Sequence, residues 1–201
     1  MDTETTDRTG REHPIIFSGE MVRAILEGRK TQTRRVIKGG YVLDEPGIVA
    51  ATVEAYKEAW IKTCPYGHPG DMLWVREGIR RKHNGLIPDA ITYTADDSPC
   101  VGKGGPVQTW GRAAWGWKAN ARPPRFMPRW ASRITLEITG LRVERIQDIT
   151  DEDVVAEGLY GGGYLFMALW DSINAKRGYG WESNPFVLVI TFKVIEGVSH
   201  D

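Results

Sequence analysis

Long apolar runs are missing from this sequence of 201 residues. The longest one, Phe186 to Phe192, is far too short to span a bilayer. The N-terminal stretch MDTETTDRTGREHP is polar and has no apolar signal region. We therefore expect a cytoplasmic protein with no membrane partner.

Cysteine is also scarce, since the chain has two cysteines, and its formal net charge is zero. Two cysteines in a chain of this length favour a reducing compartment over a disulfide scaffold. A zero net charge provides no global field that selects nucleic acid or membrane, so any electrostatic preference must be local. Zinc-type side chains are present, but their spacing matches no standard finger or ribbon, and we expect no metal and no organic cofactor. These side chains are Cys64, His68, His83 and Cys100.

The elements that the sequence predicts are of mixed type. Apolar residues recur at helical spacing between Ser18, a candidate N-cap, and Gly28, a candidate helix stop. Stretches rich in threonine and β-branched residues predict strands at RKTQTRRVI, GDMLWVREGIR, DAITYTA and PFVLVITFKV. Residues 133–146 alternate cleanly and predict two strands separated at Gly140.

Two helices are expected in the C-terminal half. The first begins after Thr150, which forms a capping-box-like pair with Asp153, and it ends at Gly158. The second carries apolar residues at helical spacing around Phe166 and Trp170. Together the elements predict an α+β fold, in which antiparallel strands form a small barrel with a few flanking helices.

One domain is expected, with a flexible tail at residues 1–13 and the domain itself at residues 14–196. Two stretches differ from the rest: residues 38–70 are heterogeneous, with several glycine and proline breakers, and residues 97–128 are rich in glycine and proline and long for a loop of a compact domain, which indicates a functional or partly disordered segment. The first has a possible helix near 53–61. The sequence leaves the oligomeric state open, with a monomer as the simplest expectation.

The stretch GRKTQTRR after the first helix contains four cationic side chains and two threonines. One interpretation is an exposed corner whose cations are solvated. Another is a site, because a partly desolvated lysine crowded by arginines has a lowered pKa and could accept the proton of a threonine hydroxyl. Strand alternation puts the lysine and the second threonine on opposite faces, so they meet only if the lysine belongs to the corner. The residues concerned are Lys30, Thr33, Arg29, Arg34 and Arg35.

Glu157 lies in the last turn of its predicted helix, where the helix dipole disfavours an anion by about 0.3–1 kcal/mol. A solvated glutamate tolerates this cost. The alternative is a carboxylate held there for a function, such as pairing with Lys30 or with an arginine.

Residues 98–136 contain no acidic residue, and tryptophans are interleaved with their cations. Cations can grip phosphates while indole rings stack on bases, which is typical of nucleic-acid binding. The alternative is that the tryptophans cap the barrel and the arginines pair with the acid-rich stretch 144–157. Trp117 and Arg122 are the candidates for nucleic-acid contact in this region.

The stretch LWVRE is ambiguous. Alternation sends Trp74 and Arg76 to one face and Glu77 to the other, apolar face. A glutamate on an apolar face is either paired with an arginine or directed into a cleft. We therefore name Trp74, Arg76 and Glu77 as further candidates for binding substrate or nucleic acid.

The motif ILEGRKTQTRR resembles the signature corner of the ASCH superfamily, whose members are PUA-like β-barrels. Further blocks support the resemblance: CPYGHPGDMLWVRE, PRWASRITLEIT, DITDEDVVAEG and LWDSIN followed by NPFVLVITF. Together they cover most of residues 14–194 and look like ASCH-type proteins of phages and prophages. The resemblance implies a PUA-like barrel with a cleft for a modified nucleoside or RNA.

One branch of this superfamily, the small bacterial N4-acetylcytidine amidohydrolases, has a similar GRKT-x-T-x-R motif. The resemblance implies that Lys30 is the base, Thr33 the nucleophile and Glu157 the third member of a triad. The amidohydrolases are about half as long as this chain and lack counterparts of 38–70 and 97–128, so the resemblance makes these two stretches inserts and leaves the natural substrate open.

Three functions are therefore compared. The first is an amidohydrolase acting on an N-acylated nucleoside without a metal. The second is a non-catalytic module, or a ribonuclease, that binds RNA or single-stranded nucleic acid through Trp117, Arg122 and the cations of the corner. The third is a phage-encoded interaction protein whose surface tryptophans contact a protein partner.

Overall fold

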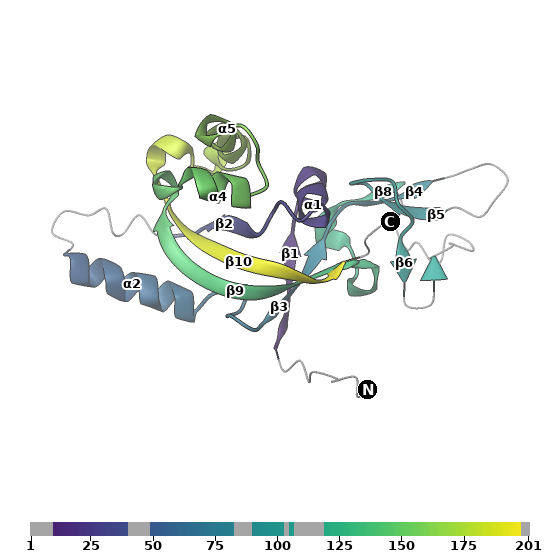
Figure 1. The fold of residues 1–201 in the computed structure, drawn as a ribbon, viewed down its shortest axis with the longest axis horizontal. Helices are drawn as coiled ribbons and strands as arrows, with labels where there is room; N and C mark the ends of the chain where they lie inside the picture. The colour runs from purple at the N-terminus through teal and green to yellow at the C-terminus, as the bar shows by residue number, and fades with distance from the viewer. Residues whose placement is uncertain (1–9, 40–48, 83–89, 103–104, 107–118, 198–201) are drawn as a thin grey trace.

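The computed structural model describes residues 10–39, 49–82, 90–102, 105–106 and 119–197. The strands are β1 (Glu12–Ile16), β2 (Gln32–Val36), β3 (Met72–Arg76), β4 (Ile79–Lys82), β5 (Ala90–Tyr93), β6 (Val101–Gly102), β7 (Gly105–Pro106), β8 (Ala121–Arg122), β9 (Ile134–Arg145) and β10 (Phe186–Gly197). The α-helices are α1 (Gly19–Leu26), α2 (Ala50–Lys62), α4 (Asp151–Ala156) and α5 (Gly163–Asn174). The predicted α+β class is confirmed (Figure 1).

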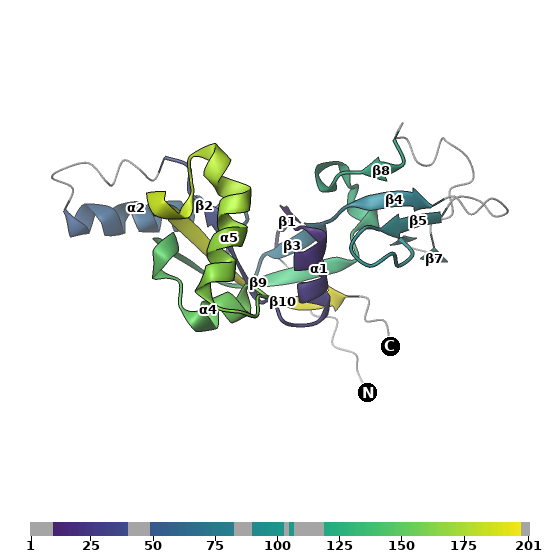
Figure 2. The same ribbon diagram turned by 90° about the horizontal axis from the view of Figure 1, so that it is seen from above.

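The main sheet has five strands in the order β1-β3-β9-β10-β2. The β1–β3 pair is parallel, and the other neighbours are antiparallel, so the sheet is mixed. A second sheet of three strands has the order β5-β4-β8, and β6 and β7 form a hairpin. Seen from above, the second sheet lies at one end of the main sheet, away from α2, α4 and α5 (Figure 2).

Strands β9 and β10 form the curved centre of the main sheet (Figure 1). The prediction that Gly140 separates two strands is wrong, because β9 is continuous from Ile134 to Arg145. The pairing skips Thr139, which is bulged between the pairs of Gly140 with Thr191 and of Ile138 with Phe192. A Cβ atom at Gly140 would lie 2.7 Å from the Thr191 hydroxyl, so the glycine serves close strand approach rather than a turn.

The apolar stretch of β10 is buried on both faces, which explains why it does not alternate in sequence. Leu188 and Ile190 pack into the core beneath α1, together with β1, β3 and β9. Val187 and Val189 point the other way and pack against α4 and α5. The closing strand predicted at 185–194 is therefore confirmed, and it separates the two cores.

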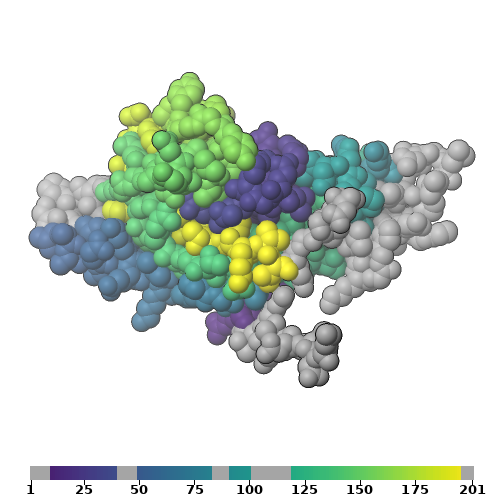
Figure 3. Space-filling view, viewed as in Figure 1, coloured from purple at the N-terminus to yellow at the C-terminus, as the bar shows by residue number. Residues whose placement is uncertain are grey.

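Helices α4 and α5 lie on one side of the main sheet and α2 on the other (Figures 1 and 2). In the space-filling view, α1 abuts α4 and α5 (Figure 3). The helix predicted near 53–61 is present as α2, and its Trp60 ring lies 5.5 Å from the Phe186 ring. The strand predicted at 70–80 is instead two strands, β3 and β4, because the chain leaves the main sheet at Glu77 and Gly78.

Helix α4 ends at Gly158, as the sequence predicts, and two observations require a glycine there. Its φ is +88°, and a Cβ atom would lie 2.9 Å from the Cβ of Ala24 and 3.0 Å from that of Lys30. We expect Gly158→Ala to lower the free energy of unfolding by about 1–3 kcal/mol, measured by urea denaturation.

Gly163→Ala is the matched control for this substitution. Gly163 is the first residue of α5, and a Cβ atom there meets nothing within 4 Å. Alanine favours a helix over glycine, so this variant should be as stable as the wild type or slightly more stable. Equal losses in the two variants would contradict the packing argument.

In the part of the chain that the structure describes, no helix is both long and apolar enough to cross a membrane.

Candidate functional site

The basic corner after α1 caps the C-terminal end of α4. Gly28 has a φ of +72° and turns the chain, after which three successive groups meet the last carbonyls of α4. The Thr31 N–H donates to the Ala156 carbonyl at 2.8 Å. Lys30 Nζ donates to the Glu157 carbonyl at 2.9 Å, and Arg29 Nη1 to that of Gly158 at 2.6 Å. Cations are favoured at this negative end of the helix dipole, so the run is not simply a solvated corner.

Lys30 and Glu157 form a buried ion pair. Lys30 Nζ lies 2.6 Å from Glu157 Oε2, and the two side chains are 0% and 6% exposed. Lys30 pairs with Glu157 as an isolated bridge before β2 begins, so it belongs to the corner rather than to the strand. Burial lowers the pKa of Lys30, Glu157 opposes this effect, and Arg35 and Arg34 add to it. The pairing of Glu157 with Lys30, open in the sequence, is present.

Arg34 connects this pair to a larger ionic network. Its guanidinium contacts Glu144 Oε1 at 2.6 Å, Asp153 Oδ2 at 2.7 Å and Glu157 Oε1 at 3.2 Å. Arg142 contacts the same Glu144 and Asp153 from β9. The Arg34 side chain is 1% exposed, so the network holds α4 against β2 and β9 inside the protein. The sequence assigns Asp153 to helix capping alone, and the network is a second role for it.

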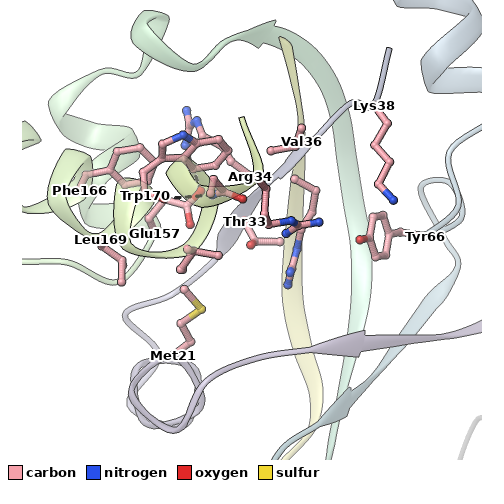
Figure 4. A pocket seen from close by; sticks show the side chains of 14 residues that line it. Met21, Thr33, Arg34, Val36, Lys38, Tyr66, Glu157, Phe166, Leu169 and Trp170 are labelled. Carbon is pink, nitrogen blue, oxygen red and sulfur yellow. Dashed lines mark hydrogen bonds and ion pairs between the residues drawn. The ribbon is translucent and has the colours of Figure 1, made fainter. Parts of the chain in front are cut away.

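A cavity of about 310 Å³ lies between β2, α5 and the segment around Tyr66 (Figure 4). Thr33, Glu157 and Arg35 line it, together with Met21, Arg34, Val36, Lys38, Tyr66, Phe166, Leu169, Trp170, Ile173, Asn174 and Arg177. This volume is at the lower end of the range for small-molecule sites. In the close-up, Phe166 and Trp170 lie on the side of Glu157, whereas Lys38 and Tyr66 lie opposite (Figure 4).

Thr33 is 3% exposed and has no hydrogen-bond partner for its hydroxyl among the described residues. Because Thr33 borders the cavity, water or a ligand there can complete the hydrogen bonds of its hydroxyl. Within the same described part of the chain, Lys30 reaches the cavity through Glu157 and makes no direct hydrogen bond to Thr33. The wall therefore combines a threonine hydroxyl with a carboxylate that holds a buried lysine.

Arg35 differs from its neighbour Arg34 in having no carboxylate partner in the described residues. Its Nη2 donates to the Ile16 carbonyl at 2.7 Å, so the side chain connects β1 and β2, the two edges of the main sheet. Its guanidinium carbon lies 5.2 Å from the centre of the Phe17 ring and 5.9 Å from that of Tyr66. Burial lowers the pKa of Arg35, and Tyr66 and Glu157 oppose this effect.

Among the described residues, the other candidates do not line this cavity. Arg29 donates to Glu27 and lies over the Tyr160 ring, 5.3 Å from its centre. The Trp74 ring is covered by two arginines at the junction with the second sheet. The guanidinium carbon of Arg76 lies 5.0 Å from the ring centre, and that of Arg129 lies 5.7 Å from it.

Glu77 is paired with an arginine rather than directed into a cleft, which is one of the two interpretations that the LWVRE stretch allows. Its oxygens accept from Arg133 Nε at 2.8 Å and Nη2 at 3.0 Å, and the Glu77 side chain is 1% exposed. Burial raises the pKa of Glu77, and Arg133 opposes this effect. This pair stabilises the junction between the sheets and does not enter the cavity.

Trp117 lies outside the described residues, and Arg122 is in β8, where it pairs with Ile79 of the second sheet. Cys64 and Cys100 belong to different core clusters, and His83 also lies outside the described part of the chain. Among the residues that the structure describes, no group of three His, Cys, Asp or Glu side chains could hold a metal ion.

Sequence reasoning named four of the fourteen residues that line the cavity and missed the other ten. Phe166 and Trp170 were recognised only as the apolar face of a helix, which they also are. Tyr66, Lys38 and Arg177 come from three separate segments, and no local pattern distinguishes them from surface residues. Only their meeting point in space identifies them.

The fold and the site thus define an α+β protein with a small cavity that has a cationic wall and a buried lysine–glutamate pair beside it. No protein-family model matches the sequence, and no curated protein matches it significantly. Among solved structures, an ASCH domain from Lactobacillus crispatus JV V101 is similar with a TM-score of 0.47 and 10% identity, covering 98% of this chain and 87% of that one. A protein of Enterococcus faecalis V583 assigned to the DUF984 family is similar with a TM-score of 0.44 and 10% identity, covering 95% and 84%. These similarities are too low to bear on chemistry.

Proposed function

We propose that this protein is an amidohydrolase that acts on an N-acylated nucleoside such as N4-acetylcytidine. The observation that carries the proposal is the position of Thr33, whose unpaired hydroxyl shares a cavity wall with Glu157, while Glu157 holds Lys30. A hydroxyl is a poor nucleophile unless a base accepts its proton. A lysine whose pKa is lowered by burial can be that base.

The reaction proceeds in two halves. Neutral Lys30 takes the proton of the Thr33 hydroxyl, the threonine oxygen bonds to the acetyl carbon, and the bond from that carbon to N4 breaks. The leaving nitrogen takes the proton back from Lys30, and cytidine departs. Lys30 then takes a proton from water as the water oxygen bonds to the acyl carbon, and the bond from that carbon to the threonine oxygen breaks. Thr33 regains a proton from Lys30, and the second water proton leaves with the acetic acid, which ionises to acetate. Glu157 orients Lys30 and stabilises its protonated form during the first half.

The cavity suits a ligand of this size and polarity. Phe166 and Trp170 supply aromatic surface for a planar base on the side of Glu157 (Figure 4). Arg34 is bound to three carboxylates and sets the position of Glu157, so it acts on the reaction as a positioning residue.

The test is to incubate the purified protein with N4-acetylcytidine over a series of pH values and to follow cytidine by chromatography. We expect cytidine to appear, at a rate that rises with pH, since deprotonation of Lys30 supplies the base. Because burial lowers its pKa, the rise should be centred below about 10.4, the ordinary value for lysine. Lys30→Met should release no cytidine at any pH in the series.

Absence of cytidine at every pH would refute the amidohydrolase proposal. Binding of single-stranded RNA that weakens steeply with salt would then favour the non-catalytic module. RNA cleavage that is lost in Lys30→Met would instead favour the ribonuclease.

A further inference from the structure

The charges around the cavity are not balanced within the described residues. Arg34 is neutralised by its carboxylates, and Glu157 is neutralised by Lys30 and Arg34. Three other cations line the cavity without a carboxylate partner in the described chain: Arg35, Lys38 and Arg177. Lys38 and Arg177 are exposed, and water solvates them, so neither requires a further explanation.

Arg35 does require one. Its Nε atom is buried and has no hydrogen-bond partner, and among the described residues its side chain makes one hydrogen bond, to the Ile16 carbonyl. Arg35 as a whole is partly exposed, but an arginine nitrogen held away from water without a partner is costly, and arginines inside proteins normally pair with carboxylates. The adjacent Arg34 follows that rule, which makes the contrast within one strand informative. Arg35 instead lies over aromatic rings: its guanidinium carbon is 5.2 Å from the centre of the Phe17 ring and 5.9 Å from that of Tyr66.

The surroundings of Arg35 favour an anion. Tyr66 and Lys38 lie together on the side of the cavity opposite to Phe166 and Trp170 (Figure 4). A hydroxyl, an ammonium and a guanidinium are the groups that bind phosphate oxygens in proteins. Glu157 is the one acidic residue in the described wall, and it belongs to the other side.

We propose that Arg35, assisted by Lys38, binds a phosphate group of the ligand, so that the preferred ligand is a nucleotide rather than a free nucleoside. Thr33 and Arg35 are two residues apart on β2, which places them on one face of the strand about 7 Å apart. One nucleotide can therefore present its base to Thr33 and its phosphate to Arg35. The identity of the reacting group rests on the proposed function, whereas the phosphate contact does not.

The test measures binding without turnover. Isothermal titration calorimetry at low salt compares cytidine, cytidine 5′-monophosphate and a short RNA with a 5′-phosphate, none of which contains an acyl group. We expect the wild type to bind cytidine 5′-monophosphate at least about tenfold more tightly than cytidine, through a charge-assisted contact. Tighter binding of the RNA than of the mononucleotide would identify an RNA end as the source of the phosphate.

Variants assign the effect to Arg35. Arg35→Met should remove the preference for the phosphorylated ligand, and Arg35→Lys should retain part of it. Lys38→Met should reduce it, whereas Lys176→Met, which changes an exposed lysine outside the cavity wall, should leave it unchanged. Equal affinities for cytidine and its monophosphate in the wild type, or no binding of either, would overturn the inference. So would a preference that survives in Arg35→Met.

The two proposals fail separately. A preference for the phosphorylated ligand without any deacylation of N4-acetylcytidine or its 5′-phosphate would leave the anion site standing and remove the amidohydrolase. Deacylation without a preference for the phosphorylated ligand would leave the amidohydrolase standing and remove the anion site.

Discussion

Arg34→Met is expected to lower the free energy of unfolding by about 3–5 kcal/mol, the usual cost of removing one partner from a buried ion pair. The side chain is 1% exposed and contacts Glu144, Asp153 and Glu157. Removing it leaves these carboxylates close together in a poorly solvated place, with Arg142 and Lys30 as their remaining cationic partners in the described residues. Urea denaturation followed by tryptophan fluorescence measures the loss.

Arg35→Met is the matched control, since it removes the next arginine of the same strand. It deletes a partly exposed charge that has no carboxylate partner in the described residues, and the hydrogen bond it removes there is the one to the Ile16 carbonyl. These effects oppose each other, and we expect stability within about 1 kcal/mol of the wild type. A loss in Arg35→Met as large as that in Arg34→Met would contradict both the ionic network and the interpretation of Arg35 as a ligand contact.

Thr33→Val is expected to reduce deacylation of N4-acetylcytidine by about three orders of magnitude or more, because it removes the nucleophile of the proposed reaction. Valine has nearly the same shape as threonine, so the buried position remains filled. The hydroxyl has no protein partner among the described residues, and its loss leaves no donor or acceptor unpaired. Stability should therefore be maintained or slightly raised, which separates a catalytic effect from unfolding.

Thr31→Val is the control for this variant. Thr31 is exposed, lies two residues earlier and contributes its backbone N–H to the cap of α4, which valine retains. Turnover by Thr31→Val should match the wild type, and the rate is measured by chromatography of released cytidine. Activity in Thr33→Val above about a tenth of the wild-type rate would exclude Thr33 as the nucleophile.

Much of the secondary structure could be predicted because its signals are local. Ser18 accepts a hydrogen bond from the Met21 N–H at the start of α1, and Thr150 and Asp153 form the capping box of α4. Such signals involve residues three positions apart, so they are visible in one short stretch. The strand end predicted at Gly140 is wrong because a glycine required by close strand approach has the same sequence signature as a glycine that ends a strand.

The candidate site was only partly predictable. Lys30 and Glu157 were noticed for two separate anomalies, a crowded cation and an anion at the wrong end of a helix, and the structure brings them together at 2.6 Å. The same criteria also selected Arg29, Arg76 and Glu77, which stabilise the end of α4 and the junction between the two sheets. Charge counting alone does not distinguish Arg34 from Arg35, because the difference is made by carboxylates far along the chain.

By itself, the sequence determined most of the segments that become helices and strands, where α1 and α4 begin and end, and that a cationic corner follows α1. These properties depend on residues a few positions apart, whose backbone geometry is decided by short-range hydrogen bonds and sterics. Only the tertiary structure decided that Lys30 faces Glu157 across 127 positions, that Arg34 is neutralised and Arg35 is not, and that a cavity separates α5 from Tyr66. Those outcomes depend on how β10 pairs with β2 and β9, and burial then turns ordinary surface charges into groups that need a partner.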